Sequence, residues 1–558
     1  MELVTAWVRP PHQIGGLDHL GVQAPCIQIY SDLLPGITNV TDRARYYSFY
    51  PWLLVRFDQK EWRTATDIIK MLRRAECLLS LIGLYHASKT SDSHEDHQAA
   101  MVGNGVLSGA LEKLLIGEQV NLSDHAHLDD HSSRYFKNPY GGFGQYYFGT
   151  LVGLGLLSGD SPAQARVPEE TGAILAEIVN KCVPGDLFIQ TLIDDKISLQ
   201  TVSDLVPFCA CQLKHSEEER NLLIEIMHKG WLALHTGKVE SAEQSSSSRA
   251  RSQSLAYLCL LTDVASKTDQ GFDIKCFRAL SYSLHDSKQQ EIKFPESIKN
   301  RVLNWQVYQR NELLSVGLQG LLFCQLRAAE LSKRGFNSFP TTQSLSEWFW
   351  TESDLKDVID NDNKPTTYEY TELVVSKLPP ISDWTNVKHE IQCLYRIVRE
   401  TGLMNTTWDQ LITITQDCVT VLAAVLSRPE NQVGYDQYQF PDNYLDHYPV
   451  NLKSLKQEWK KGIGEQPIQD GLISLSQHYC LDTHLRVAMR KLSQQSKNTF
   501  RFEPSEIGLK LNGIPKVANT TPRFKQAVRI MQDLGLLESK SAKLIVTEMG
   551  WQFVERIK

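Results

Sequence analysis

The stretch that decides the fold at the end of the chain is "TPRFKQAVRIMQDLGLLESKSAKLIVTEMGWQFVERIK", from Thr521 to Lys558. Its apolar residues recur every three to four positions, which predicts an amphipathic helix that ends near Leu534. Gly535 stops this helix, and "LLESKSAKLIVTEMG" has the pattern of a short β-hairpin before a last helix, "WQFVERI". We therefore expect a compact helix–hairpin–helix module.

This end of the chain is basic, whereas the rest is acidic. Residues 451–558 hold 18 Lys and Arg against 10 Asp and Glu, although the whole chain has a net charge of −7. A basic module on an acidic body is typical of contact with nucleic acid, and a basic end docked on the acidic body is the alternative. The predicted DNA-binding residues are Arg523, Lys525, Arg529, Lys540, Lys543, Arg490 and Lys491.

The composition indicates an ordinary globular protein. The chain has 558 residues, of which 42% are hydrophobic and 22% charged, enough for three to four domains. The first residues do not have the pattern of a secretory signal, and no apolar run has the length of a membrane span. The eleven cysteines are scattered, which favours free thiols in a reducing compartment. A cytoplasmic location and no membrane partner are therefore expected.

Helical periodicity dominates the chain, so the predicted fold class is mainly α: a multi-helical body with a small C-terminal α/β-hairpin domain. Strand signals are short, at "TFRFEP" and "AKLIVTE". The Ser-rich stretch 240–254 is interpreted as a mobile linker or the start of the next helix. Expected helices cover Glu61–Ala87, Ser216–Leu234, Ser297–Gly335, Asp383–Thr401, Trp408–Ser427 and Pro467–Gln494. The predicted domains are 1–120, 145–240, 250–450 and the basic 451–558.

Two groups of side chains suggest metal chemistry. "HAHLDDH" (residues 125–131) combines imidazoles and carboxylates in a spacing close to that of metallo-β-lactamase-like hydrolases, with one residue too many. "FCACQLKH" brings together Cys209, Cys211 and His215, but no second ligand pair follows with zinc-finger spacing. A hydrated loop and core thiols are the expected structures, and neither a metal nor another cofactor is predicted.

Catalytic signals are equally sparse. Arg278 and His285 in "RALSYSLH" have the spacing of HEPN ribonucleases, which keeps a nuclease effector as an alternative. Phosphate-binding loops, dinucleotide fingerprints and nucleophile elbows are absent from the sequence. If ATP powers the pathway, a partner protein supplies the motor. No catalytic residue is therefore predicted.

Two resemblances guide the functional expectation. The helix, the Leu-Gly-Leu turn, the basic hairpin and "LIVTEMG" resemble winged-helix domains, which bind DNA or dock on proteins. "SDLLPGITNVTDRARYYSFYPWLLVRF" (residues 31–57), "THLRVAMRKL" and "TFRFEP" resemble uncharacterised helical subunits of bacterial anti-phage defence clusters. A Zorya-like family with a Glu/His signature is one named possibility, through Glu400 and His447.

The resemblances imply a non-catalytic DNA-binding or scaffold subunit of a multi-component defence system. Its expected partners are DNA, bound electrostatically, and other subunits, including an ATPase or a nuclease. Two alternatives remain: a nuclease effector, and a scaffold whose winged helix docks on an ATPase.

Overall fold

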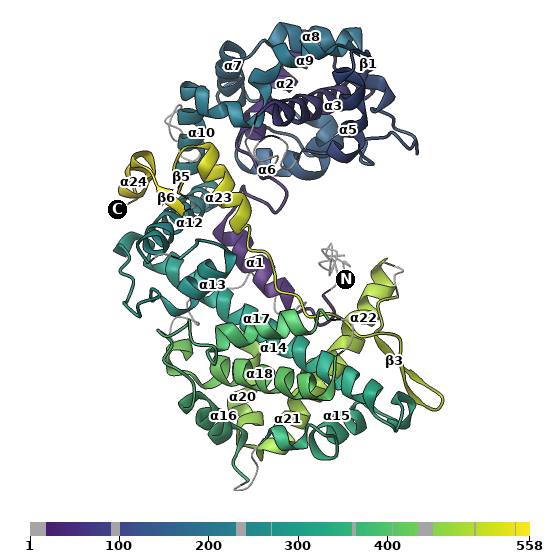
Figure 1. The fold of residues 1–558 in the computed structure, drawn as a ribbon, viewed down its shortest axis with the longest axis vertical. Coiled ribbons are helices and arrows are strands. Elements are labelled where there is room, and N and C mark those ends of the chain that lie inside the picture. The colour runs from purple at the N-terminus through teal and green to yellow at the C-terminus, as the bar shows by residue number, and fades with distance from the viewer. Residues whose placement is uncertain are drawn as a thin grey trace, which may run out of the picture. The chain divides into compact units, whose positions relative to one another are not determined.

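The computed structural model describes residues 18–90, 97, 101–229, 242–268, 270–359, 364–403, 406–432, 450–495, 498–541 and 543–557. It is mainly helical, which confirms the predicted fold class at this level (Figure 1). The described strands form three separate two-stranded antiparallel sheets, of which β3–β4 and β5–β6 are hairpins. The chain divides into two compact units, each made of segments that are distant in sequence.

The first unit, here named the α14 unit, comprises residues 1–30, 268–294 and 302–520. It contains most of α1 (Gln23–Leu33) and of α14 (Lys299–Leu331). Its other elements are α13 (Ile274–Ser283), α15 (Thr342–Thr351), α16 (Thr367–Ser376), α17 (Glu390–Glu400), α18 (Trp408–Ser427), α20 (Leu452–Lys461), α21 (Ile468–Leu475), α22 (Asp482–Gln495), β3 (Phe502–Ser505) and β4 (Gly508–Leu511).

The second unit, here named the α3 unit, comprises residues 31–267, 295–301 and 521–558. Its elements are α2 (Arg45–Gln59), α3 (Ala65–Lys89), α5 (Asn104–Leu115), β1 (Val120–Asn121), α6 (Phe148–Gly153), α7 (Gly172–Cys182), α8 (Gly185–Asp194), β2 (Lys196–Ile197), α9 (Leu199–Asp204), α10 (Glu217–Lys229), α12 (Ala242–Lys267), α23 (Phe524–Asp533), β5 (Leu537–Lys540), β6 (Lys543–Val546) and α24 (Glu548–Glu555).

Helix α14 is the centre of its unit, because it is buried on every side along most of its length. Two glycines let α18 approach it closely. A Cβ at Gly320 would lie 2.3 Å from the Cys418 sulfur, and one at Gly317 would lie 2.9 Å from Leu422. The absence of side chains at these two positions therefore sets the packing of the two helices.

Helix α18 begins and ends where the sequence predicts. Among the described residues it is the one helix whose length and composition would suit a membrane span, with a mean hydropathy of 1.4. About 67% of its apolar window is buried inside the protein, which is the environment of a core helix.

Of the two interpretations of the Ser-rich stretch, the structure agrees with the beginning of the next helix, because α12 begins at Ala242 and includes most of the stretch. Tertiary hydrogen bonds explain how this stretch is held in a helix. The Ser254 hydroxyl donates to the Leu33 carbonyl at 2.6 Å. The buried Arg251 guanidinium donates to the Ile226 carbonyl at 3.0 Å. These contacts outweigh the weak helix preference of serine.

Two buried histidines connect the beginning and the end of the α14 unit. The backbone N–H of Arg501 donates to Nε2 of His484 at 2.9 Å, and Nδ1 of His484 lies 3.2 Å from the His19 carbonyl. This pattern requires a neutral His484 imidazole. Burial lowers the pKa of His484 to about 4, and burial with the Arg501 charge lowers the pKa of His19 to about 3.

Acid should destabilise this unit. Both histidines have a folded pKa below the unfolded value of about 6.5, so the stability they contribute is present above pH 6.5 and is lost as pH falls towards 4. We expect the free energy of unfolding to fall by at most about 1.4 kcal/mol per pH unit for each histidine. Urea unfolding between pH 7 and pH 4.5 measures this slope, and His484→Gln should make it shallower. An equally steep slope in the variant would contradict the assignment.

Candidate metal centre

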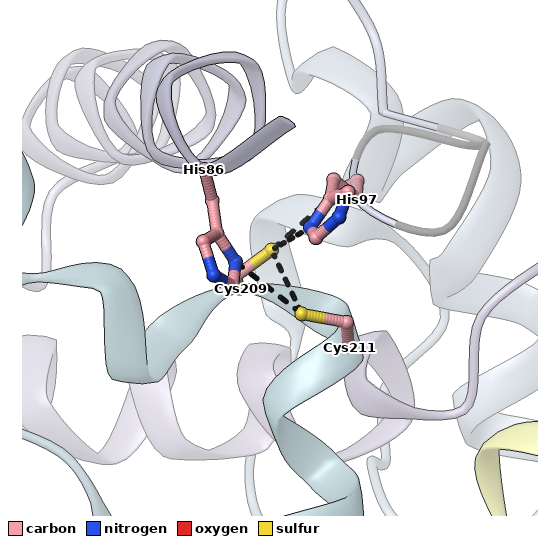
Figure 2. Close-up of side chains that lie close together, drawn as sticks. All are labelled: His86, His97, Cys209 and Cys211. Carbon is pink, nitrogen blue, oxygen red and sulfur yellow. Dashed lines mark hydrogen bonds between the residues drawn. The ribbon is translucent and has the colours of Figure 1, made fainter. Parts of the chain in front are cut away.

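Four side chains of the α3 unit converge on one point: His86, His97, Cys209 and Cys211 (Figure 2). Each offers one ligand atom, and no two of these atoms are more than 4.8 Å apart. Among the described residues this is the one group of three or more such side chains that could hold a metal ion. His97 and Cys209 are buried, whereas His86 and Cys211 are half-buried.

Local structure brings the four residues together. Helix α3 begins at the Thr64 cap, whose hydroxyl accepts from the Asp67 N–H at 3.1 Å, and its last turn carries His86. This helix packs against α9 and the short 3₁₀ helix that ends at Phe208. Cys209 has an extended backbone and separates that turn from a second 3₁₀ helix, Ala210–His215, which carries Cys211. The two thiols therefore face the end of α3.

The separations fit a tetrahedral zinc ion. Zinc binds thiolate sulfur at about 2.3 Å and imidazole nitrogen at about 2.0 Å, so a tetrahedron places two sulfurs about 3.8 Å apart and sulfur and nitrogen about 3.5 Å apart. The two cysteine sulfurs lie 3.7 Å apart. Nδ1 of His97 lies 3.6 Å from Cys209 Sγ, and Nδ1 of His86 lies 3.3 Å from Cys211 Sγ. Two thiolates and two imidazoles are also the donors that zinc prefers.

Thr90 fixes the tautomer of His97. Its hydroxyl donates to the His86 carbonyl at 3.1 Å, so its oxygen accepts from Nε2–H of His97 at 2.9 Å. The proton on Nε2 leaves a lone pair on Nδ1, the atom that points at Cys209. A hydrogen bond of this kind on the far nitrogen is what orients metal-binding histidines.

The two thiols share their protons unequally. The hydrogen bond between the two sulfurs lowers the pKa of Cys211 to about 6, with Gln212 and His86 also favouring the thiolate. The same hydrogen bond and burial raise the pKa of Cys209. The pair therefore holds one thiolate at neutral pH, and thiolate is the form that binds a metal.

The sequence pattern predicted Cys209 and Cys211 to be core thiols and predicted no metal site. It grouped Cys209 and Cys211 with His215, whose side chain is exposed, whereas the structure supplies His86 and His97. Both histidines precede the cysteines by more than 100 positions. The Cys-x-Cys pair, which has no second ligand pair close to it in the sequence, was the one sequence feature that indicated a metal site here.

The side chains of the "HAHLDDH" residues bond to other residues of the same loop. Nδ1 of His131 lies 2.7 Å from the Ser133 hydroxyl, Nδ1 of His125 lies 3.3 Å from the Ser133 carbonyl, and Arg134 pairs with Asp130 at 2.6 Å. Among the described residues these side chains do not gather around one ion.

Arg278 and His285 have different partners. The buried Arg278 lies 3.5 Å from Glu312 and donates to the Thr520 carbonyl. Nδ1 of His285 lies 2.7 Å from the Ser283 carbonyl. Of the Glu/His pair, Glu400 is paired with Arg399 at 2.8 Å, and His447 lies outside the described residues.

Three of the predicted DNA-binding cations have partners inside their own unit. Arg523 donates to the Leu34 carbonyl at 2.9 Å, and Arg529 lies 3.1 Å from Asp42. Lys491, in the α14 unit, donates to the Asp18 carbonyl at 2.6 Å. These contacts are intramolecular.

The remaining four predicted residues are at least partly accessible. Lys525 and Lys540 are exposed, whereas Lys543 and Arg490 are half-buried. Lys540 lies opposite Lys543 at the end of the β5–β6 hairpin.

Comparison with known proteins adds no further constraint. The chain matches no family model, and neither curated proteins nor solved structures give a significant match. The functional argument therefore rests on the geometry of the molecule itself.

Removing the Thr90 hydroxyl tests the ligand geometry. We expect Thr90→Val to weaken zinc binding about 10–100-fold, because Nε2 of His97 loses the acceptor that fixes its tautomer. Thr90→Ser keeps the hydroxyl and should restore the affinity. Competition against a zinc chelator measures both values, and equal affinities in all three proteins would show that Thr90 has no such role.

Proposed function

We propose that this protein is a non-catalytic scaffold whose α3 unit is stabilised by one Zn²⁺ bound to His86, His97, Cys209 and Cys211. The observation that carries the proposal is the agreement of three separations between ligand atoms, 3.3, 3.6 and 3.7 Å, with the edges of a zinc tetrahedron. Four protein ligands complete that tetrahedron and leave no position for water or substrate, as in structural zinc sites.

The ion would join segments that are distant in sequence. It would connect the end of α3 with the 3₁₀ helix Ala210–His215, which packs against α2, α10 and α23. Zinc bound only by the folded chain contributes its binding free energy to folding, about 10–16 kcal/mol in small zinc domains. A scaffold of this size would thus gain a rigid centre where its helices meet.

Metal analysis tests this proposal. We expect one zinc per chain and, after substitution with Co²⁺, the visible spectrum of a tetrahedral thiolate site. Cys209→Ser should lose the metal and lower the free energy of unfolding by about 4 kcal/mol or more, since loss of a metal is among the largest single effects. Cys182→Ser is the matched control, because Cys182 is exposed and lies outside the cluster. A Cys209→Ser protein that keeps its zinc would refute the proposal.

A second candidate function is electrostatic contact with DNA by the C-terminal module, which would act as a winged helix. Exposed Lys525 and Lys540, within a segment of 18 basic and 10 acidic residues, favour it. Membership of an anti-phage system with an ATPase or nuclease partner remains a prediction from the resemblance alone.

Salt-dependent binding tests this second function. Each phosphate contact adds about 0.9 to the slope of log affinity against log salt, so Lys525→Glu/Lys540→Glu should reduce the slope by about 1.8. Lys60→Glu/Lys70→Glu makes the same charge change on exposed side chains at α2 and α3 and should leave the slope unchanged. Fluorescence anisotropy with duplex DNA gives both slopes. Equal changes of the slope in the two double variants would mean that DNA binding depends only on the net charge of the protein, which would contradict a role for Lys525 and Lys540.

A further inference from the structure

We propose that Cys209 and Cys211 are also a redox site, at which a hydroperoxide converts the two thiolates into a disulfide and expels the zinc. This inference rests on the proposed function, because it concerns the regulation of the same centre.

The sulfurs are placed for bond formation. They lie 3.7 Å apart, and a disulfide bond is about 2.05 Å long, so they need to approach by less than 2 Å, roughly. Only Ala210 separates the two cysteines, and the extended backbone of Cys209 lies between two short 3₁₀ helices. We expect rotation of the side chains and small changes in this loop to join them.

One of the two sulfurs can be reached from solvent. Cys211 is half-buried and lines a cavity of about 380 Å³, whereas Cys209 is buried. The cavity is much larger than the volume of one water molecule, so a small peroxide fits. Its lining is polar, with Arg43, Lys214 and Arg529 beside Asp533 and Glu538. Cys211 is therefore the sulfur that reacts with the peroxide, and Cys209 is the resolving thiol.

The chemistry balances with the peroxide as the oxidant. The Cys211 thiolate attacks one peroxide oxygen, the O–O bond breaks, and a sulfenic acid and one hydroxide form. The Cys209 thiolate then attacks the Cys211 sulfur, the S–O bond breaks, and the disulfide and a second hydroxide form. Two solvent protons convert the hydroxides to water, and the two electrons lost by sulfur are gained by the peroxide.

Oxidation would remove two of the four zinc ligands at once. His86 and His97 alone bind zinc too weakly to retain it, so the ion leaves. The loop that carries the disulfide also carries the contact with α23, because the same cavity is lined by Asp533 and Leu537. Release of zinc should therefore loosen the attachment of the C-terminal module.

The test is peroxide titration of the full-length, zinc-loaded protein. A zinc-binding dye follows the metal, and peptide mass spectrometry locates the disulfide. We expect one hydroperoxide equivalent to release one zinc and to join Cys209 to Cys211, in both the natural sequence and Cys182→Ser. Dithiothreitol with added zinc should reverse the change. Limited proteolysis near Thr521 should become at least about 10-fold faster after oxidation, since cleavage follows the population of the open form.

The outcomes separate the two proposals. A protein without zinc before oxidation overturns both of them. Zinc that stays bound after peroxide, or oxidation confined to Cys182, overturns the redox inference and leaves the structural zinc proposal intact. Zinc release with Cys209 and Cys211 still unlinked also overturns the inference. These measurements on the natural sequence do not depend on the folding of a Cys211 variant.

Discussion

Four soft or borderline ligand atoms within 4.8 Å of one another are the constraint on which the proposed role of the α3 unit depends. Burying such groups together is unfavourable, because each needs a hydrogen-bond partner and the hydrogen bonds that they make to one another are weak. Thr90 accepts from one histidine nitrogen, the Gln212 amide donates to the Cys211 sulfur, and the remaining contacts of the two sulfurs and the two Nδ1 atoms are largely with one another. A divalent cation resolves this arrangement, because it satisfies four donors at once.

The segment of residues 31–44 in the α3 unit holds the C-terminal module in place. Asp533, at the end of α23, accepts three hydrogen bonds from Arg43 and one from the backbone N–H of Ala44, at 2.8 to 3.2 Å. The Arg43 guanidinium is almost fully buried, so removing its partner would leave an unpaired buried charge. With Arg523 and Arg529 bonded nearby, α23 is held against residues 31–44 of its own unit. Docking of basic side chains on the body, one of the two readings of the charge asymmetry, thus has direct contacts in its favour.

The sequence predicts those parts of the fold that depend on local pattern. Helix α18 was located to the residue, α14 within a few residues, and strands β3 and β6 lie where the short strand signals occur. The Ser-rich stretch was ambiguous because its helix depends on tertiary hydrogen bonds such as Ser254 to Leu33. The ligand set was missed for a similar reason. His86 and His97 meet the cysteines only after α3 has packed against α9, and the Cys-x-Cys spacing is shorter than the usual zinc pattern.

Whether the proposed zinc centre only stabilises the fold or can also react with an oxidant depends on how deeply its cysteine ligands are buried. A zinc ion enclosed by four buried ligands would be inert, since no reagent could reach its sulfurs. Here burial protects Cys209 and His97, whereas Cys211 is half-buried and borders a polar cavity. The ligand exposed in this way is the one whose loop also contacts α23. In this proposal the same four side chains both stabilise the fold and make it sensitive to oxidation. The exposure of the Cys211 sulfur determines whether the centre is only a structural zinc site or can also be oxidised.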